Sequence, residues 1–418
     1  MHTVYSLDDL NPEKLEVIAK TYRRYGFVMF QALTHKQCGE LVLEQWRHVI
    51  QKQEWKDEYK IVVHSLEDDA VLDVNDEQHK EEFLKAVIGP LSPPVRKRYE
   101  NGWPLHRGFG ATCDPAVFHL KLVWDIRQDP RIYQVAAFLT GVDELVVGIN
   151  RSIQKLPGQG DNEFQHWDFN PFFMDKEARR AQKTELCGKV VYTPSRFLCF
   201  PKTHKTKFVK EVVEKYAEHY PNVKSSDKKF AFDSKKPDPL NIMGMRTELP
   251  LPAGVLLFWS PDLVHGQMKT PIGDPVEYGS YLGFWAKGNG SRQKYEDTCG
   301  VDELQDRLRS YNEGAAPLLW PSFDKVQFYP KKFDNFPKIM KGYIDKLPDN
   351  HPMIADGFTA KGVPKKYLIP VPLVNYTPPV LSELGQKLLG MREWSDKPAK
   401  RTAVDEADVE GASKKKRT

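Results

Sequence analysis

The chain holds few cysteines, and none of them stands in a metal-binding or redox spacing. Five cysteines are scattered over 418 residues, an odd number without a Cys-x-x-Cys pair. This usage argues against a disulfide framework and against a zinc ribbon. We therefore expect a reducing compartment, either the cytoplasm or the nucleus.

Long apolar runs are missing as well. No stretch of about 18 apolar residues occurs, so we expect no membrane span. Residues 1–17 contain no apolar segment of the kind that a secretory signal requires. Both absences agree with a reducing compartment.

An excess of one charge sign is also absent. Lysine and arginine number 61, aspartate and glutamate number 57, and the formal net charge is +4. This balance does not by itself indicate a nucleic-acid partner. Lysines are concentrated in residues 205–246 and 287–394, which can cover a pocket or contact a phosphorylated or nucleic-acid substrate. The final KKKR is interpreted as a solvated tail rather than a nuclear address.

Turn residues are plentiful, and helix signals gather near the N-terminus. The 31 prolines and 27 glycines imply many turns, and a hydrophobic fraction of 40% is ample for a packed core. Asn11, Pro12 and Gly26 mark the two ends of a helix, and Thr34 caps a second one. Residues 26–33 between the two helices have a strand pattern.

The middle of the chain alternates between strand patterns and helix or loop patterns. Apolar or alternating stretches predict strands at residues 144–156, 163–169, 196–201, 251–261 and 276–286. Helices are predicted within 79–88, 114–140 and 202–221, a charged helix or loop at 174–190, and a polar loop at 221–246. Short strands with helices mainly at the N-terminus predict an antiparallel β-sandwich or barrel flanked by helices.

A His-x-Asp pair lies within an aromatic stretch, EFQHWDFNPFF, at residues 163–173. Residues at i and i+2 point the same way only on an extended strand, so His166 and Asp168 can address one point. Such a strand suggests a metal site. A loop histidine that is hydrogen-bonded to a neighbouring aspartate has the same spacing, and this alternative stays open.

A third candidate ligand follows later in the chain. In GVLLFWSPDLVHGQMK a buried strand ends shortly before His265, which places an imidazole at the rim of an apolar core. Two imidazoles and one carboxylate form the facial triad typical of Fe(II) oxygenases, with positions left open for oxygen and a cosubstrate. The same donors can hold zinc, but the sequence supplies no evident general base for a zinc hydrolase. The other histidines lack a partner motif and are interpreted as structural or surface residues: His106, His119, His204 and His219.

Five motifs occur in an order that resembles a known family. They are GFVMFQALTHKQCGELV, KLPG, HWD, RFLCFPKTHK and LPAGVLLFWSPDLVHG. Together, over residues 15–286, they resemble the phytanoyl-CoA dioxygenase-like branch of the Fe(II)/2-oxoglutarate-dependent oxygenases. The resemblance implies a mainly β fold with flanking helices, a double-stranded β-helix or jelly roll.

The same resemblance implies a domain organisation. Residues 1–294 would form the oxygenase-like jelly roll with N-terminal helices and an insertion at about 205–246. Residues 295–394 would form a C-terminal extension packed on the core. Residues 395–418 have the polar composition of a disordered tail.

Family roles transfer to this chain only at matching positions. The resemblance implies that His166, Asp168 and His265 bind the iron. Lys155 matches the lysine of a Lys-Pro-Gly stretch that precedes the His-x-Asp pair in the family. His204 matches a histidine that we interpret as structural and not as a ligand.

One departure from the family concerns the cosubstrate. In the family, an arginine on the strand after the second histidine pairs with the far carboxylate of 2-oxoglutarate, which its planar fork suits. The matching strand here, VEYGSYLGFW, has no arginine or lysine and offers Tyr278. Candidate replacements are Lys269 in the turn before this strand, and Arg151 and Lys155 on another strand.

Three interpretations of this departure stay open. A displaced cation can bind 2-oxoglutarate, the enzyme can use another reductant such as ascorbate, or iron is held without turnover in a binding protein on the same fold. For an enzyme, the resemblance implies O₂-dependent hydroxylation of a C–H bond in an unidentified small-molecule or modified-polymer substrate.

Overall fold

The computed structural model describes the chain in several stretches. They are residues 3–51, 111–112, 118–150, 152–155, 165–173, 184–224, 230–233, 235–266, 268, 277–287, 303–314, 317, 319–320, 327–328 and 376–394. The predicted helix at 79–88 and the tail at 395–418 lie outside these residues.

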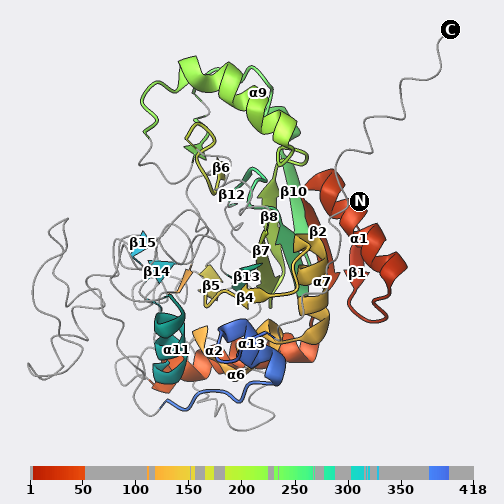
Figure 1. Cartoon of the computed structure of the whole chain (residues 1–418), viewed down its shortest axis with the longest axis vertical. Coiled ribbons are helices and arrows are strands. Elements are labelled where there is room, and N and C mark those ends of the chain that lie inside the picture. Colours follow the sequence, from red (N-terminus) through yellow and green to blue (C-terminus); the bar gives the residue numbers. More distant parts are fainter. Residues whose placement is uncertain are drawn as a thin grey trace, which may run out of the picture.

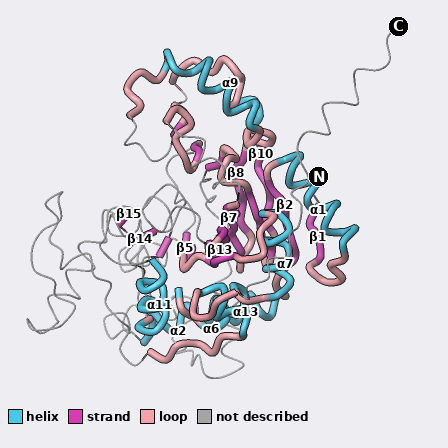
Figure 2. The backbone as a smooth tube through the Cα atoms, in the orientation of Figure 1, coloured by secondary structure: helices cyan, strands magenta, loops and turns pink. Residues whose placement is uncertain are grey.

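Two β-sheets form the centre of the described structure (Figure 2). The larger sheet contains, in spatial order, β1 (Val4–Ser6), β2 (Phe27–Gln31), β11 (Val255–Trp259), β7 (Glu185–Val191), β13 (Glu277–Ala286), β5 (Ser152–Lys155) and β3 (Ala111–Thr112), and β4 (Leu145–Val147) also pairs with β13. The smaller sheet contains β10 (Thr247–Leu251), β8 (Ser195–Cys199), β12 (His265–Gly266), β6 (His166–Trp167) and β9 (Phe230–Ala231). A separate hairpin pairs β14 (Leu319–Trp320) with β15 (Gln327–Phe328).

Alternating side chains show that the two sheets face each other. On β11, Leu256 and Phe258 belong to one apolar cluster, whereas Val255 and Leu257 belong to another. The second cluster also contains side chains from both sheets, namely Phe27, Met29 and Val191 from the larger sheet and Phe197, Cys199, Leu249 and Leu251 from the smaller one. This cluster therefore fills the space between the sheets, as expected when one face of each strand is turned to a shared core. We call this space the inter-sheet core.

Helices cover the outer face of the larger sheet (Figure 1). They are α1 (Pro12–Tyr25), α2 (His35–Gln51), α6 (Lys121–Arg127), α7 (Pro130–Thr140), α11 (Glu303–Glu313) and α13 (Glu383–Leu389). Buried side chains from all six contribute to the cluster that contains Leu256 and Phe258. Helices α11 and α13 come from the C-terminal part of the chain, and these two helices pack on the same core as the N-terminal helices.

A third layer lies on the outer face of the smaller sheet. Helix α9 (Thr206–Tyr216) continues into the 3₁₀ turn η3 (Ala217–His219), and a second 3₁₀ turn, η4 (Met243–Met245), follows further on. Their apolar side chains join Trp167, Phe169 and Phe230 in one aromatic cluster. Figure 1 shows α9 on the opposite side of the molecule from α2, α6, α11 and α13.

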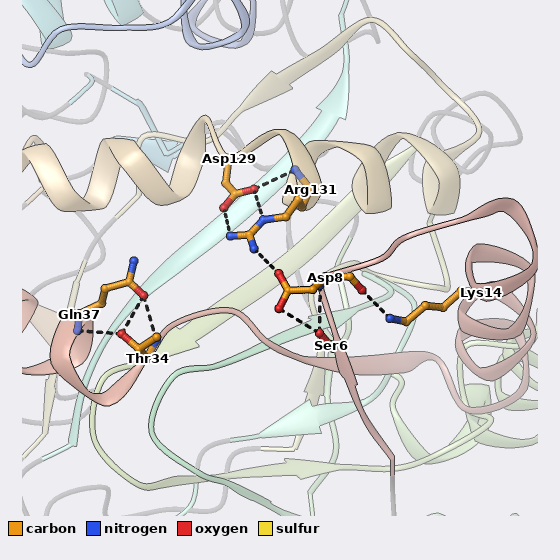
Figure 3. A network of polar contacts seen from close by, with 7 residues as sticks. All are labelled: Ser6, Asp8, Lys14, Thr34, Gln37, Asp129 and Arg131. Carbon is orange, nitrogen blue, oxygen red and sulfur yellow. Dashed lines mark hydrogen bonds and ion pairs between the residues drawn. The ribbon is translucent and has the colours of Figure 1, made fainter.

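Local hydrogen bonds explain where the first helices begin. Asn11 accepts from the backbone N–H of Lys14 at 2.8 Å and caps α1, and Gly26 ends that helix with φ +84°. Thr34 and Gln37 bond each other reciprocally as a capping box at the start of α2. Figure 3 shows this pair beside the network of Asp129, Arg131 and Asp8, in which Arg131 joins the start of α7 to the segment after β1. The predicted helices at the N-terminus are confirmed.

Several predictions for the middle of the chain were wrong in part. Residues 185–191 form the central strand β7, although we expected a charged helix or loop over 174–190. The predicted strand at 144–156 is divided into β4 and β5, and the polar loop at 221–246 contains β9 and η4. Glu185, Gly188 and Lys189 interrupt the apolar pattern of β7. For this reason the sequence pattern did not predict a strand there.

The described structure is thus mainly β with flanking helices. Almost all strand pairs are antiparallel, and β1 with β2 is the parallel exception among the described pairs. Within the described residues, no helix combines the length and the apolar character that a bilayer span requires.

Candidate metal centre

The two histidines of the predicted triad are direct neighbours in the smaller sheet. β6 and β12 pair antiparallel, and His166 is the register partner of His265. Paired residues of an antiparallel ladder project to the same face, so the pairing brings both imidazoles together. Their ring centroids are 4.5 Å apart.

The register also shows which way these side chains point. His265 is the register partner of Cys199 as well, and Cys199 lies in the inter-sheet core. His166 and His265 therefore project into the space between the sheets. Asp168 is two residues from His166 and projects the same way, whereas Trp167 lies in the aromatic cluster under α9.

The three donor groups lie close enough to share one ion. Each residue offers one ligand atom, and these atoms all lie within 4.8 Å of one another. The Asp168 carboxylate lies 3.6 Å from Nε2 of His166 through one oxygen and 3.6 Å from Nε2 of His265 through the other. Metal–nitrogen bonds of about 2.1 Å place donors at such mutual distances with only a small contraction. A His-Asp-His site that can hold a metal is therefore present.

A hydrogen bond fixes the tautomer of His265. Its Nδ1 lies 2.9 Å from the carbonyl oxygen of Leu263. A carbonyl can only accept, so Nδ1 carries the proton, and the Nε2 of the neutral ring keeps its lone pair for a metal. This arrangement is the usual way in which proteins orient a ligating imidazole.

Two aromatic rings lie beside His265, and the three candidate donors differ in their exposure. Phe197 stacks on the His265 ring with centroids 5.8 Å apart, and Trp259 lies 5.5 Å from it. The imidazoles are 14% and 10% exposed, whereas the Asp168 side chain is 35% exposed. The Asp168 carboxylate is therefore the most exposed of the three candidate donor groups.

Trp167 links the two segments that carry the ligands. Its Nε1 donates to the carbonyl oxygen of Asp262 at 2.6 Å, and Asp262 precedes His265 by three residues. On its other edge, β6 pairs with β9, where His166 faces Ala231. The segment that we predicted as a polar insertion therefore supports the His-x-Asp strand directly.

A buried ionic cluster projects into the same inter-sheet space. Glu277 on β13 forms an ion pair with Lys189 on β7 and lies 3.7 Å from Lys155 on β5. Lys189 also donates to Ser195 at 2.9 Å, and Lys155 donates to the carbonyl of Met268. We call these three charged residues the Lys–Glu–Lys cluster. Each is less than 7% exposed.

Burial and the neighbouring charges have opposite effects on the pKa values of Lys155 and Glu277. Burial lowers the pKa of Lys155, an effect that Glu277 opposes. Burial raises the pKa of Glu277, but the ammonium groups of Lys189 and Lys155 outweigh it and hold that pKa below its usual value of 4.5. Glu277 is therefore ionised at neutral pH.

The structure does not place the other candidate site residues beside the triad. Tyr278 is fully buried in the cluster on the helix-covered face of the larger sheet, away from the inter-sheet core. Arg151 and Lys269 lie outside the described residues. His204 contacts the carbonyl of Arg23 at 3.0 Å and His119 contacts Trp124, so neither is in the triad.

Lys189 is the residue of this region that the sequence did not reveal. It lies in a stretch that was interpreted as a helix or loop, where a lysine suggests solvent. The signal that could have found it is the sequence Lys-Val-Val-Tyr (189–192), in which a charge adjoins a β-branched apolar run.

Comparisons with known proteins gave structural matches only. No family model matches the chain, and no curated protein sequence matches it. Similar solved structures include the non-haem α-ketoglutarate-dependent epimerase SnoN from nogalamycin biosynthesis (15% identity, 66% of this chain and 84% of that chain, TM-score 0.34) and the non-haem monooxygenase ThoJ (14%, 64% and 77%, 0.35). A third is EctD from S. alaskensis with 2-oxoglutarate and 5-hydroxyectoine (14%, 68% and 79%, 0.36). At these identities and TM-scores, nothing about the function of the chain follows from the matches.

Proposed function

We propose that this protein is a non-haem Fe(II) dioxygenase that uses 2-oxoglutarate to hydroxylate a C–H bond of a small-molecule or modified-polymer substrate. The observation that carries the proposal is the convergence of His166, Asp168 and His265 within 4.8 Å in the inter-sheet space. Two neutral imidazoles and one carboxylate are the donor set that suits Fe(II) and leaves coordination positions open.

The fold proposed for this activity is a jelly roll of the phytanoyl-CoA dioxygenase-like branch. Two facing, mainly antiparallel sheets with the candidate ligands on the smaller one support it. We keep the predicted division into an oxygenase-like unit at 1–294 and a C-terminal extension at 295–394 as part of the proposal.

In this function, some residues would bind the metal and others would orient a ligand or exclude water. Ferrous iron with 2-oxoglutarate and O₂ would supply the oxidant for an unactivated C–H bond. His166, Asp168 and His265 would hold the metal, the hydrogen bond from His265 to Leu263 would keep its Nε2 available, and Phe197 and Trp259 would exclude water from one side.

Anaerobic titration of the metal-free protein with Fe(II) and then 2-oxoglutarate tests the proposal. A keto acid that chelates iron on such a triad gives a weak visible charge-transfer band at about 500 nm. We expect this band in the wild type at one equivalent of iron and not in Asp168→Ala. Iron binding without the band would leave an iron site with another reductant such as ascorbate, and absence of iron binding would contradict the proposal.

A further inference from the structure

We propose that the side chains of Cys187 and Tyr281, together with the open position at Gly283, form the surface that holds the substrate opposite the candidate metal centre. We call these three residues the substrate surface. The substrate class is a small neutral organic molecule. This inference rests on the proposed function, because the molecule would present its C–H bond to the metal that the triad holds.

Exposure along the two central strands of the larger sheet differs between their faces. Cys187 on β7 and Tyr281 on β13 pack against the inter-sheet core and are partly exposed. Their neighbours on the opposite face, Leu186 and Leu282, are at most 2% exposed. Inner faces of two packed sheets normally interdigitate and form the core. Partial exposure on the inner face therefore indicates that the packing between the sheets is incomplete at these positions.

Gly283 extends this incompletely packed region. It is the register partner of Cys187 and is also partly exposed. Among the described residues, a β-carbon added to Gly283 would meet only the carbonyl oxygen of Leu186, at an ordinary contact distance of 3.4 Å. At Gly279, on the same face of β13, an added β-carbon would approach the carbonyl oxygen of Val190 to 2.5 Å. The missing side chain of Gly283 thus leaves space that Gly279 does not.

The order of the strands places the substrate surface opposite the candidate ligands. Phe197 on β8 packs on Trp259 of β11 with ring centroids 5.0 Å apart, so these two strands face each other. Lys155 on β5 donates to the carbonyl of Met268, which follows β12 by two residues, so the two sheets continue in the same direction from that contact. β12 therefore faces β7, and β6 faces β13.

The two histidines of the triad accordingly project toward the substrate surface. Packed sheets lie about 10 Å apart, and side chains from both sheets extend into this distance. Trp259 joins the two sides directly, because it is the register partner of Cys187 and its ring lies 5.5 Å from that of His265. A molecule that rests on the substrate surface would therefore lie beside the metal.

The charges on this face favour a neutral molecule. Among the described strand residues of the larger sheet, the charged side chains on the inner face are Glu185 and Lys189 on β7, Glu277 on β13 and Lys155 on β5. They are two acids and two bases, so their formal charges cancel. A charged molecule would lose hydration without gaining a net opposite charge, which is costly. The substrate surface itself offers a thiol and a phenol ring, which suit an organic molecule.

Three small thiosulfonates of different charge test the inference by their rates of reaction with Cys187. They are neutral methyl methanethiosulfonate, the cationic trimethylammonium-ethyl reagent and the anionic sulfonatoethyl reagent, and each rate is divided by the rate with 2-mercaptoethanol. Peptide mass spectrometry follows Cys187, with the buried Cys38 and Cys199 as internal references. Gly283→Leu adds a side chain that would fill the space, and Ala286→Leu, at the end of β13 and on its other face, is the matched control.

We expect the neutral reagent to modify Cys187 at least about tenfold faster than either charged reagent, and faster than it modifies Cys38 or Cys199. Gly283→Leu should slow this reaction by about tenfold or more, and Gly283→Val takes its place if the leucine variant does not fold. Ala286→Leu should react like the wild type. Equal rates for the three reagents, a Cys187 as unreactive as the buried cysteines, or an unchanged rate in Gly283→Leu would overturn the inference.

A nitroxide label on Cys187 distinguishes failure of this inference from failure of the proposed function. The label is attached in a Cys113→Ser/Cys299→Ser background, and Mn(II) is added in place of iron. We expect Mn(II) to shorten the spin relaxation of the nitroxide, and to have no such effect when His265→Ala is added. Metal binding without this effect would overturn the inference. If no metal binds, the proposed function fails. A preference of Cys187 for the neutral reagent would then still support the binding surface, and its absence would overturn it.

Discussion

The indole of Trp167 donates a 2.6 Å hydrogen bond to the carbonyl oxygen of Asp262 and so joins the two segments that carry the candidate ligands. Trp167 stands between His166 and Asp168, and Asp262 precedes His265 by three residues. The bond is fully buried, and the Trp167 ring is stacked on Phe169 at 5.2 Å. The aromatic cluster under α9 therefore fixes the position of both ligand segments without contributing a ligand.

Trp167→Phe should weaken metal binding without removing any donor atom. The variant leaves the Asp262 carbonyl buried without its indole partner, at a cost of about 1–3 kcal/mol in folding stability. Loss of a supporting group around a metal site typically costs about tenfold to a hundredfold in affinity. We expect a decrease of this size in Mn(II) or Co(II) affinity, measured by calorimetry.

Trp259→Phe is the matched control for this prediction. Trp259 is also buried and lies 5.5 Å from His265, but its Nε1 has no hydrogen-bond partner among the described residues. Its replacement should change metal affinity much less. Equal effects of the two variants would show that aromatic packing, and not the bond to Asp262, positions the ligands.

If the triad binds the metal, replacing His265 should weaken metal binding, whereas replacing His204, which is not in the triad, should not. His265→Ala removes one of three donors and should weaken divalent-metal binding by at least about a hundredfold, more than loss of a supporting residue does. His204→Ala removes a ring that contacts the carbonyl of Arg23. This variant should bind one equivalent of metal as tightly as the wild type does. Equilibrium dialysis with Mn(II) distinguishes the two, and tight binding by His265→Ala would contradict the assignment of the ligands.

The sequence predicted those parts of the fold whose signals are local. Asn11, Gly26 and Thr34 mark helix ends by their own hydrogen bonds, so both N-terminal helices could be predicted. β7 could not be predicted in this way, because the charge of the buried Lys189 is compensated by Glu277, a residue 88 positions away that no local pattern reveals. The division between β4 and β5 also depends on distant residues, because the two strands pair with different parts of β13.

The three candidate metal ligands could be predicted from the sequence, but the contacts that surround and position them could not. His166 and Asp168 share a strand face by spacing alone, and the motif order suggested His265. The direct pairing of β6 with β12 is a long-range contact, as are the links from Trp167 to Asp262 and from Lys155 to Met268. Such contacts depend on the register of distant strands, which the sequence does not express locally.

Ionisation of Glu277 should make stability depend on pH in acid. Lys189 and Lys155 hold the folded-state pKa of Glu277 below its usual value of 4.5. The resulting stabilisation is fully present above that value and is lost as the pH falls through the lowered pKa of the folded state. Glu277→Gln leaves two buried ammonium groups uncompensated, and we expect it to lower the free energy of unfolding by about 3 kcal/mol at pH 6.

Urea denaturation at several pH values measures this effect. The difference between the wild type and Glu277→Gln should shrink as the pH falls below 4.5. Glu383→Gln is the control, because the pair of Glu383 with Lys387 on α13 is exposed and should leave the pH profile close to that of the wild type. A difference that stays constant down to pH 3 would show that the carboxylate of Glu277 is not the stabilising form.

Arg307 should prove essential for attaching the C-terminal helices to the core. Its guanidinium is 2% exposed, donates to the carbonyl of Val147 on β4 at 2.6 Å and to the carbonyls of Leu388 and Leu389 on α13 at 3.1 and 3.2 Å, and lies over the Trp285 ring. Arg307→Ala would leave these buried carbonyls without their donor, which should lower the free energy of unfolding by about 3 kcal/mol. Arg392→Ala, which removes a 55% exposed arginine near the end of α13, should change it by less than about 1 kcal/mol. Urea denaturation compares the two, and similar small effects would show that α13 is held by its apolar contacts alone.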